Sequence, residues 1–334
     1  MVSIQWLKLT AGGALISFVG FNAAVSSSSL MGDRAIATEP VALQSQPASA
    51  SNLQLLAQAQ PKKIQIVFPG RADATDLKTK IDAVASFLTR EMGMPVEGVI
   101  ADETAAVEAL RANRADVAFL SSRPALKAEQ LANAKLYLAE VRPNYSGGHT
   151  YRSIFVVPKD SPLATKASNK QTLEQLRGKK IAFTSPTSGS GFIFPVAEMV
   201  KQGLVPNRDR VKDFFRQVAY GNGYSGALQA VLRGQADVAA VSEYALKPPY
   251  ITEAEAKKLR VLAFISNVPA HGIAIDDDVP TSVRNKLINA MMKLNEPGNN
   301  KLLKDLGNAT NLVRVNHDRH LSPMREALKR AGIE

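Results

Sequence analysis

The chain has 334 residues, of which 45% are hydrophobic and 21% charged, so it can bury a substantial core and has room for about two lobes of ordinary domain size. It contains no cysteine, which excludes disulfides, zinc-thiolate sites, thiol nucleophiles and a lipid-modified N-terminal cysteine. A formal net charge of +11 favours an anionic partner, but the Lys and Arg residues are scattered and carry no DNA-binding motif, which argues against nucleic acid.

The first 28 residues are typical of an export signal. Lys8 is their only charge, and an apolar stretch rich in small residues runs from Leu9 to Val25. Because this stretch is short and contains glycines, a cleaved signal is favoured over an uncleaved membrane anchor, which stays open as the alternative. Residues 29–61 are rich in Ser, Ala, Gln and Pro, the composition of a disordered linker. We therefore expect an exported, periplasmic protein.

Strand and helix patterns alternate from residue 62 onward. The sequence predicts, in order, a strand at 64–68, a helix at 77–92 with an apolar stripe, a strand at 99–100, a helix at 103–114 and a strand at 117–120. This alternation predicts an α/β fold with a mostly parallel sheet covered on both faces.

A near repeat is the most informative internal feature. The segment 110–118 is echoed by 232–239, and each predicts a helix end, a tight turn, an Asp and a buried strand. The two units end on the polar pairs Ser121-Ser122 and Ser242-Glu243, which suggests two similar lobes. Since ligands of open α/β sheets lie at the carboxyl ends of the strands, these pairs are expected to face a cleft. Chance similarity is the alternative, because Ala-Asp-Val-Ala is a common string.

Strong strands at 151–157 and 261–265 are the expected crossings between the lobes. They divide the folded chain into a first part of lobe 1 (62–157), an inserted lobe 2 (158–265) and a return to lobe 1 (266–334), with helices near 280–296, 299–308 and 320–332. Two linkers around an inserted lobe form a hinge.

A loop of hydroxyl residues and glycines is the strongest binding candidate. The strand 180–184 runs into Ser185-Pro186-Thr187-Ser188-Gly189-Ser190-Gly191, and an apolar helix follows. Free N–H groups and the helix dipole attract an anion there, and glycines allow close approach. No Lys follows the last glycine, so a small anion suits the loop better than a nucleotide. An ordinary helix N-cap is the alternative.

Three segments together resemble the phosphonate, phosphite and phosphate substrate-binding family of ABC importers. They are the loop 185–195, the segment 227–237, and Tyr151 ahead of Lys159-Asp160-Ser161-Pro162. The resemblance spans most of 62–334. It implies a two-lobed periplasmic binding protein-like fold with a ligand cleft between lobes and a two-segment hinge. It also implies a monomer that captures a small phosphorus oxyanion for the transmembrane subunits of an ABC importer.

The resemblance carries over several ligand-binding positions. The family holds the phosphonate oxygens with a Ser-Thr-Ser type triplet, which falls on Ser188, Gly189 and Ser190, so the middle hydroxyl is missing. A family ligand tyrosine falls on Tyr151, for which packing at a strand edge is the alternative. The family's cleft histidine falls on Tyr224, which can donate a hydrogen bond but carries no charge.

Acidic and imidazole positions depart further from the family. A second family tyrosine falls on Glu103, for which a helix-start acid is the favoured alternative. Glu243 lies at or beside an acid that meets the ammonium of aminoalkylphosphonates, and a carboxylate also accepts a phosphorus O–H. The second such acid falls near His271, for which a hydrogen-bonded turn is the alternative. With one acid fewer, we expect a small, amine-free ligand. Ser121, from the first polar pair, is a further candidate.

No cofactor, metal or catalytic function is expected. His317 and His320 are three residues apart without a third ligand nearby, His149 is expected near the cleft because it precedes Tyr151, and no catalytic spacing is found. A sensor subunit for a membrane kinase and an enzyme on the same fold are the alternatives.

Overall fold

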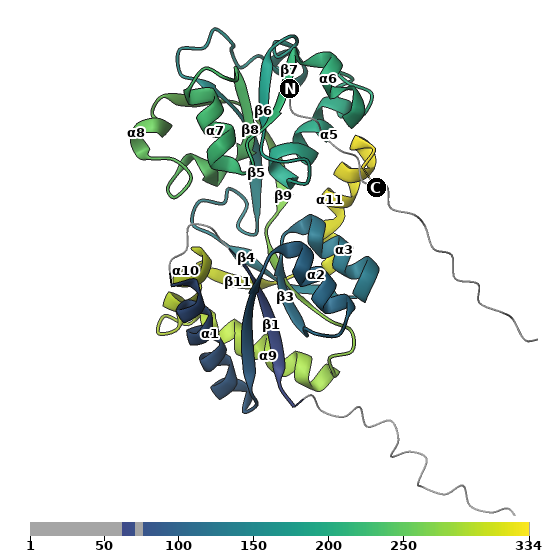
Figure 1. Ribbon diagram of the computed structural model, residues 1–334, viewed down its shortest axis with the longest axis vertical. Coiled ribbons are helices and arrows are strands. Elements are labelled where there is room, and N and C mark those ends of the chain that lie inside the picture. Colours follow the sequence, from purple (N-terminus) through teal and green to yellow (C-terminus); the bar gives the residue numbers. More distant parts are fainter. Residues whose placement is uncertain (1–61, 71–75, 334) are drawn as a thin grey trace, which may run out of the picture. The chain divides into compact units, whose positions relative to one another are not determined.

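Two β-sheets, each covered by helices on both faces, organise the part of the chain that this computed structural model describes, residues 62–70 and 76–333 (Figure 1). Both sheets belong to one compact unit. The predicted signal (1–28) and linker (29–61) lie outside the described residues. Within those residues, no helix has the length and apolar character needed to cross a membrane.

Lobe 1 is built on a six-stranded sheet with the order β11-β4-β10-β3-β1-β2. Its strands β1, β2 and β3 are parallel, whereas β10 and β11 run antiparallel to their neighbours. The prediction of a mostly parallel sheet is therefore wrong, because β10 and β11 enter this sheet after the chain has returned from lobe 2. The strands are β1 (Ile64–Pro69), β2 (Val96–Ala101), β3 (Val117–Leu120), β4 (Lys135–Val141), β10 (Gly272–Ile275) and β11 (Asn311–Arg314).

Lobe 2 is built on a five-stranded sheet with the order β7-β6-β8-β5-β9. Strands β7, β6 and β8 are parallel, and β5 pairs antiparallel with both β8 and β9. The strands are β5 (Thr150–Pro158), β6 (Lys180–Phe183), β7 (Gln217–Tyr220), β8 (Val238–Ser242) and β9 (Leu259–Pro269).

Helices of lobe 1 follow the predicted pattern. The apolar stripe predicted over 77–92 is confirmed in α1, whose buried residues include Leu77, Ile81 and Leu88. α1, α9 and α10 cover one face of the sheet, and α2 and α3 cover the other. The helices are α1 (Leu77–Met92), α2 (Glu103–Arg111), α3 (Ser122–Ala132), α9 (Thr281–Met292) and α10 (Asn300–Gly307), with the short 3-10 turn η5 (Lys293–Asn295).

Shorter helices cover the sheet of lobe 2. One face carries α4, α5 and α6, and the other carries α7 and α8. They are α4 (Asn169–Glu174), α5 (Phe194–Lys201), α6 (Val211–Phe214), α7 (Tyr224–Leu232) and α8 (Glu253–Ala256), with the turns η2 (Gly189–Ile193), η3 (Arg208–Arg210) and η4 (Glu243–Leu246).

The sequence repeat corresponds to the same construction in both lobes. Asp116 precedes β3 and its Oδ2 accepts a hydrogen bond from the N–H of Gln65 at 2.6 Å. Asp237 precedes β8 and its Oδ2 accepts from the N–H of Lys180 at 2.7 Å. In each lobe, the Asp thus joins the start of one parallel strand to the start of the adjacent one. The prediction of two similar α/β units is confirmed.

The chain passes between the lobes outside the strands predicted for that role. β5 and β9 pair with each other along their length, from Thr150 opposite Pro269 to Pro158 opposite Leu259, and both belong to the lobe 2 sheet. The predicted boundaries at 157 and 265 are therefore displaced to 142–149 and 270–271. A strand pattern alone does not show with which partner the strand pairs.

The C-terminal helix α11 (His317–Ala331) connects both lobes rather than simply completing lobe 1. It packs against α3 of lobe 1 and α5 of lobe 2, as Figure 1 shows in yellow. Leu321 is buried in the lobe 1 core, whereas Met324 and Ala327 are buried in that of lobe 2. The segment 266–334 therefore returns to lobe 1 only in part.

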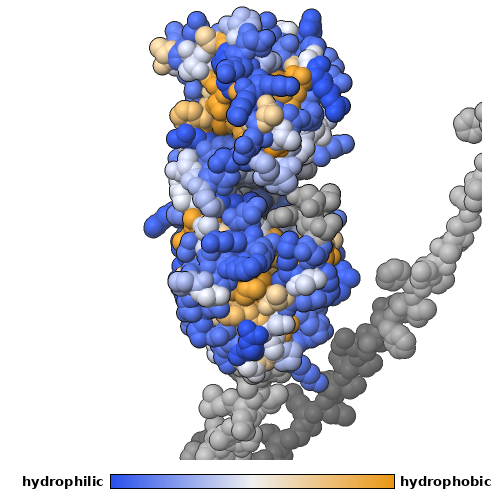
Figure 2. Space-filling model, turned by 90° about the vertical axis from the view of Figure 1, so that its left-hand side faces the viewer, coloured by the Kyte–Doolittle hydropathy of each residue, from blue (hydrophilic) through white to orange (hydrophobic). Residues whose placement is uncertain are grey.

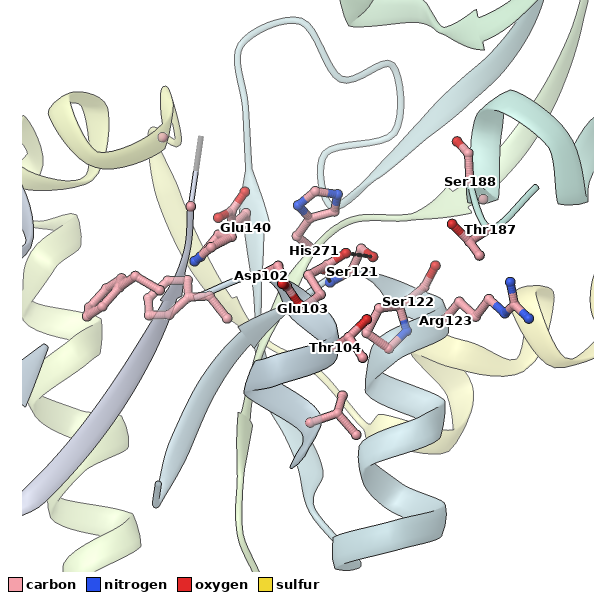
Figure 3. A pocket seen from close by; sticks show the side chains of 18 of the residues that line it. Asp102, Glu103, Thr104, Ser121, Ser122, Arg123, Glu140, Thr187, Ser188 and His271 are labelled. Carbon is pink, nitrogen blue, oxygen red and sulfur yellow. Dashed lines mark hydrogen bonds between the residues drawn. The ribbon is translucent and has the colours of Figure 1, made fainter. Parts of the chain in front are cut away.

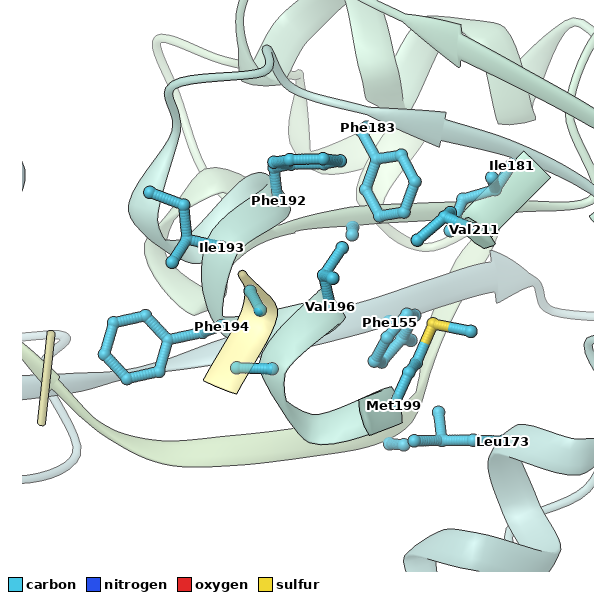
Figure 4. Close-up of a cluster of buried hydrophobic side chains, with 14 of the residues drawn as sticks. Phe155, Leu173, Ile181, Phe183, Phe192, Ile193, Phe194, Val196, Met199 and Val211 are labelled. Atoms are coloured by element: carbon cyan, nitrogen blue, oxygen red, sulfur yellow. The ribbon is translucent and has the colours of Figure 1, made fainter. Parts of the chain in front are cut away.

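A cluster of aromatic and aliphatic side chains fixes the position of α5 (Figure 4). Phe183 at the end of β6 makes an edge-to-face contact with Phe192 at 5.0 Å between ring centroids. Val196 and Met199 of α5 are fully buried in the same cluster. Burial of such side chains contributes roughly 1.5–3 kcal/mol each. The loop between β6 and α5 is thus held at both ends by rigid elements.

The face shown in Figure 2 is mainly hydrophilic, with apolar residues gathered in a few separate areas. Among the described residues, the exposed large apolar side chains are Val99, Ile100, Tyr220, Val261 and Phe264. Single exposed apolar residues are normal on a globular protein.

Asp276, which follows β10, gives a first testable prediction. Its Oδ1 accepts a hydrogen bond from the N–H of Asp277 at 2.8 Å, whereas its buried Oδ2 has no partner among the described residues. Burial, with Asp277 and Asp278 nearby, raises the pKa of Asp276 to about 7. The stability that this group contributes is therefore full below pH 4 and is lost as pH rises through about 7.

Replacing Asp276 by Asn keeps the accepting oxygen and removes the titration. We expect the Asp276→Asn variant to gain about 1–3 kcal/mol in unfolding free energy relative to wild type between pH 4 and pH 8. Urea unfolding at both pH values measures this difference. A difference that is constant with pH would show that Asp276 does not titrate in this range.

Candidate functional site

A cavity of about 1070 Å³ is lined by residues of both lobes. Seven of the nine predicted ligand-binding residues lie on its wall: Glu103, Ser121, Tyr151, Ser188, Gly189, Tyr224 and His271. Figure 3 shows side chains from lobe 1 and from the Thr187–Ser188 loop of lobe 2 around the same space. The remaining two predicted residues, Ser190 and Glu243, do not form part of this wall.

The loop after β6 combines the two roles that the sequence left open. Ser188 is the N-cap of the short π-helical turn η2, and its Oγ accepts a hydrogen bond from the N–H of Gly191 at 3.0 Å. Its own O–H remains a donor toward the cavity that Ser188 lines. A Cβ at Gly191 would lie 2.0 Å from Oγ1 of Thr184, so only glycine fits. The loop is both a helix cap and an anion-binding candidate.

A connected group of hydroxyls lies behind this loop. Ser190 is buried, and its Oγ is 2.9 Å from the hydroxyl of Tyr224, which is 3.3 Å from that of Tyr244. Tyr151 joins the group, because its ring lies 5.2 Å from that of Tyr244, and both Ser190 and Tyr244 act on the pKa of its hydroxyl. Ser190 thus orients Tyr224 from behind the wall, rather than reaching the cavity as predicted.

Tyr151 and Tyr244 of this group stay protonated. Burial raises the pKa of both Tyr151 and Tyr244 well above the usual value of 10, and the neighbouring tyrosines raise it further. Each phenol is therefore a neutral O–H donor at physiological pH. Tyr244 was missed in the sequence because it follows Glu243, to which the resemblance drew attention.

Glu103 acts within lobe 1 as a helix-capping acid. Its carboxylate accepts hydrogen bonds from the N–H of Ser121 and, at 3.0 Å, from the Oγ of Ser121. Ser121 is the N-cap residue of α3, so the carboxylate lies at the positive end of that helix. Glu103 is also the first residue of α2, as the helix-start interpretation expects, and its contact with a ligand stays a prediction.

An ion pair that sequence reasoning missed lies beside His271. Nη2 and Nε of Arg142 donate to Oε2 of Glu140 at 2.8 and 3.1 Å, and both side chains are largely buried. The guanidinium also lies 5.7 Å from the ring centre of Tyr244. Glu140, Arg142 and His271 all line the cavity. The signal in the sequence was two opposite charges two residues apart, at the end of an otherwise apolar strand.

His271 is neutral in this environment. Burial lowers its pKa, Glu140 opposes that shift and the cation of Arg142 adds to it. The neutral ring offers one donor and one acceptor at physiological pH. His271 therefore differs from the acid of the family both in charge and in its ability to donate a hydrogen bond.

Glu243 forms hydrogen bonds to the backbone of the protein. Its Oε1 accepts hydrogen bonds from the N–H groups of Ser146 and Arg152, both at 3.0 Å. It thereby fixes the segment that enters lobe 2. The geometry gives no support to the predicted contact between Glu243 and a ligand.

The histidines considered for a metal do not form a site together. Nδ1 of His317 accepts a hydrogen bond from the N–H of Leu136 at 2.8 Å, and Nε2 of His320 lies 3.0 Å from the carbonyl of Ala270. His149, expected near the cleft, packs against the ring of His320 and is not on the cavity wall.

Glu129, His317 and Asp318 bring three ligand-type atoms together. Glu129 is already paired with Lys135 and Arg325. Although burial acts to raise the pKa of Glu129, these cations and His317 lower it to about 2. The group is accounted for as an ion-pair network.

Known proteins resemble this chain over most of its folded part. A model of the family described as ABC transporter, phosphonate, periplasmic substrate-binding protein matches residues 66–321. The chain is 26% identical over 180 residues to the phosphate-import protein PhnD of Mycolicibacterium smegmatis, covering 53% of this chain and only 54% of that protein. It is 25% identical over 277 residues to the phosphonates-binding periplasmic protein of Escherichia coli, covering 81% and 77%.

Solved structures share the fold at low sequence identity. A binding protein component of an ABC phosphonate transporter from Pseudomonas aeruginosa has a TM-score of 0.62 at 19% identity, covering 81% of this chain and 87% of that one. PhnD1 of Prochlorococcus marinus, solved in complex with methylphosphonate, has a TM-score of 0.64 at 17% identity, covering 82% and 99%. The family model covers well over half of the chain, which therefore belongs to the periplasmic substrate-binding proteins of phosphonate ABC transporters.

Proposed function

We propose that this protein captures a small phosphorus oxyanion in the cavity between its lobes and delivers it to the transmembrane subunits of an ABC importer. The observation that carries the proposal is the convergence of neutral donors on one side of the cavity. Ser188, Tyr224 and Tyr244 lie on the wall. The hydroxyls form a chain that runs from the buried Ser190 through Tyr224 to Tyr244, which is its end at the cavity. Connected hydroxyls polarise one another, and an anion is the natural acceptor at the end of such a chain.

Backbone donors add to the hydroxyls. The first N–H groups of a helix have no intrahelical partner, and the turn that begins at Gly189 continues directly into α5. A phosphonate with several oxygens can accept from the loop and from the tyrosines at once. Hydrogen bonds to a charged acceptor are worth roughly 1.5–3 kcal/mol each.

An amine-free ligand fits the rest of the wall best. Glu243 is engaged by backbone N–H groups, and Glu140 is engaged by Arg142. Glu140 and Arg142 neutralise each other, so this pair offers no free carboxylate to an ammonium group near His271. The charges therefore support methylphosphonate, phosphite or phosphate over 2-aminoethylphosphonate.

Capture requires the lobes to close on the ligand. The segments 142–149 and 270–271 connect the two sheets, and short connections of this kind allow hinge closure. We propose that the closed, monomeric form docks on the importer in the periplasm, following cleavage of residues 1–28. Membership in a family of solute-binding proteins agrees with the expectation that the chain is not an enzyme.

Calorimetric titration of the purified protein tests the proposal. We expect methylphosphonate, phosphite or phosphate to bind at least about ten-fold more tightly than 2-aminoethylphosphonate, since ten-fold corresponds to only about 1.4 kcal/mol. Sulfate serves as the control anion. Tighter binding of 2-aminoethylphosphonate would contradict the inference that the charges of the cavity wall favour an amine-free ligand. Absence of binding to every phosphorus ligand would contradict the proposed function.

A further inference from the structure

Arg123 has a position in the cavity that the binding of a simple phosphonate leaves unexplained. It is the second residue of α3 in lobe 1, and it lines the cavity together with Thr187 and Ser188 of lobe 2. In Figure 3 its side chain extends from α3 on the side of the cavity where Thr187 is drawn. The start of α3 lies close to this loop, because Oγ of Ser122 is 3.9 Å from the position of a Cβ on Gly189.

No partner compensates the charge of Arg123. Throughout residues 62–70 and 76–333, no carboxylate lies within ion-pairing distance of its guanidinium, and it makes no hydrogen bond. Arg142, on the same cavity wall, has both a carboxylate and two hydrogen bonds. A partly buried cation without a partner is unfavourable, and such groups are frequent at binding sites.

A second cation acts on the pKa of Arg123. Burial lowers the pKa of Arg123, and Arg208 of lobe 2 lowers it further. Arg208 has Asp209 at 3.4 Å, but that carboxylate is mostly exposed and compensates the charge weakly. One arginine from each lobe thus acts on the same region, which an anion would stabilise.

None of the acidic side chains on the cavity wall forms an ion pair with Arg123, and each is held by another partner on its own lobe. Asp102 caps α2 through the N–H of Ala105, and Glu108 pairs with Arg111. Lys127 lines the same wall one turn after Arg123 along α3. The wall formed by α3 is therefore positive where it faces the cavity.

The cavity also has room beyond the phosphonate group. Its volume of about 1070 Å³ is at the upper end of pockets that hold drug-sized ligands. The hydroxyls and N–H groups of the loop account for one oxyanion, and Arg123 is separate from them on the opposite lobe. A ligand with only three oxygens and a methyl group would fill a small part of this space.

We infer that Arg123 forms a second anion subsite, so that the preferred ligand is a phosphonate or phosphate whose short substituent carries another anionic group. The inference rests on the proposed function and names the ligand class more closely. The phosphonate occupies the Ser188 loop, and the second anion, a carboxylate or a further phosphoryl group, pairs with Arg123. Because the two subsites belong to different lobes, such a ligand joins the lobes directly.

Titration with matched ligands tests the inference. Phosphonoacetate and propylphosphonate have similar size but differ in the charge of the substituent, and methylenediphosphonate replaces the carboxylate by a second phosphonate. We expect wild type to bind phosphonoacetate at least about ten-fold more tightly than propylphosphonate, because only phosphonoacetate has a carboxylate that can accept charge-assisted hydrogen bonds from Arg123. Comparison with methylenediphosphonate identifies which second anion is preferred.

Variants of Arg123 assign the preference to this residue. Arg123→Gln is expected to weaken phosphonoacetate about 10- to 100-fold and propylphosphonate less than about three-fold, and Arg123→Lys is expected to keep part of the preference. Arg233→Gln, at an exposed position outside the cavity, is the control and should change neither. Removal of an unpaired cation should not lower the thermal midpoint of the free protein.

The outcomes separate the inference from the proposed function. Equal losses for phosphonoacetate and propylphosphonate, no loss for either, or a thermal midpoint several degrees lower would overturn the role of Arg123. If wild type binds methylphosphonate without preferring phosphonoacetate over propylphosphonate, the inference alone fails. If wild type binds none of these ligands, the proposed function fails and the inference fails with it.

Discussion

Simultaneous replacement of Ser188 and Ser190 by Ala is expected to weaken methylphosphonate binding by about 2–4 kcal/mol, or roughly 30- to 900-fold. Ser188 would lose a hydroxyl that faces the cavity, and Ser190 would lose the hydrogen bond of 2.9 Å that orients Tyr224. The backbone donors of the loop survive the change, so binding should fall without vanishing. Calorimetric titration of wild type and variant measures the difference.

The same variant should also lose stability without ligand, because Ser188 caps the helix that begins at Gly189. The expected loss in unfolding free energy is about 1–2 kcal/mol. Ser168→Ala is the matched control: Ser168 caps α4 through the N–H of Gln171 at 3.2 Å and does not line the cavity. It should lose similar stability and no affinity. Unaltered affinity in the double variant would show that the hydroxyls of this loop do not bind the ligand.

Replacement of Glu140 by Gln is expected to lower the unfolding free energy by about 3 kcal/mol. Glu140 and Arg142 are 11% and 14% exposed and lie 2.8 Å apart. Removing one charge leaves the other buried without compensation, which typically costs about 3–5 kcal/mol. Because Gln keeps the shape of Glu and one accepting oxygen, we expect the loss of unfolding free energy to lie at the lower end of this range. Urea unfolding at pH 7 measures it.

A second substitution separates charge from packing. Combining Glu140→Gln with Arg142→Met removes the buried cation that Glu140→Gln leaves without a partner. We therefore expect the double variant to regain at least about half of the unfolding free energy that Glu140→Gln loses. Glu97→Gln provides the exposed comparison, since Glu97 and Lys63 pair at 2.7 Å with about half of each side chain exposed, and should cost less than about 1 kcal/mol. A double variant as unstable as Glu140→Gln alone would show that the loss comes from packing.

The apolar periodicity and the turn residues were sufficient to predict the individual helices, strands and turns. The apolar spacing of α1 and the Asp before each repeated strand depend on neighbours in sequence, and the structure confirms both. The hydroxyl and glycine loop was also found from sequence, because a strand, a cap and a helix start are local features. The alternation of elements alone did not yield the mixed sheets or the displaced crossings, since the pairing of β5 with β9 joins residues about a hundred positions apart.

The amino-acid sequence by itself determined the α/β class, the two similar lobes, the hydroxyl and glycine loop and, through its motifs, the family. Only the tertiary structure decided which side chains face the cavity. Ser190 and Glu243, predicted from the sequence, are not on the wall, whereas Glu140, Arg142 and Arg123 are on the wall and were not predicted. The physical reason is that a charged side chain acquires its role from the partners around it. Glu243 is engaged by distant N–H groups, Arg142 by Glu140, and Arg123 by no carboxylate within the described chain, and these relations arise only when the lobes have folded.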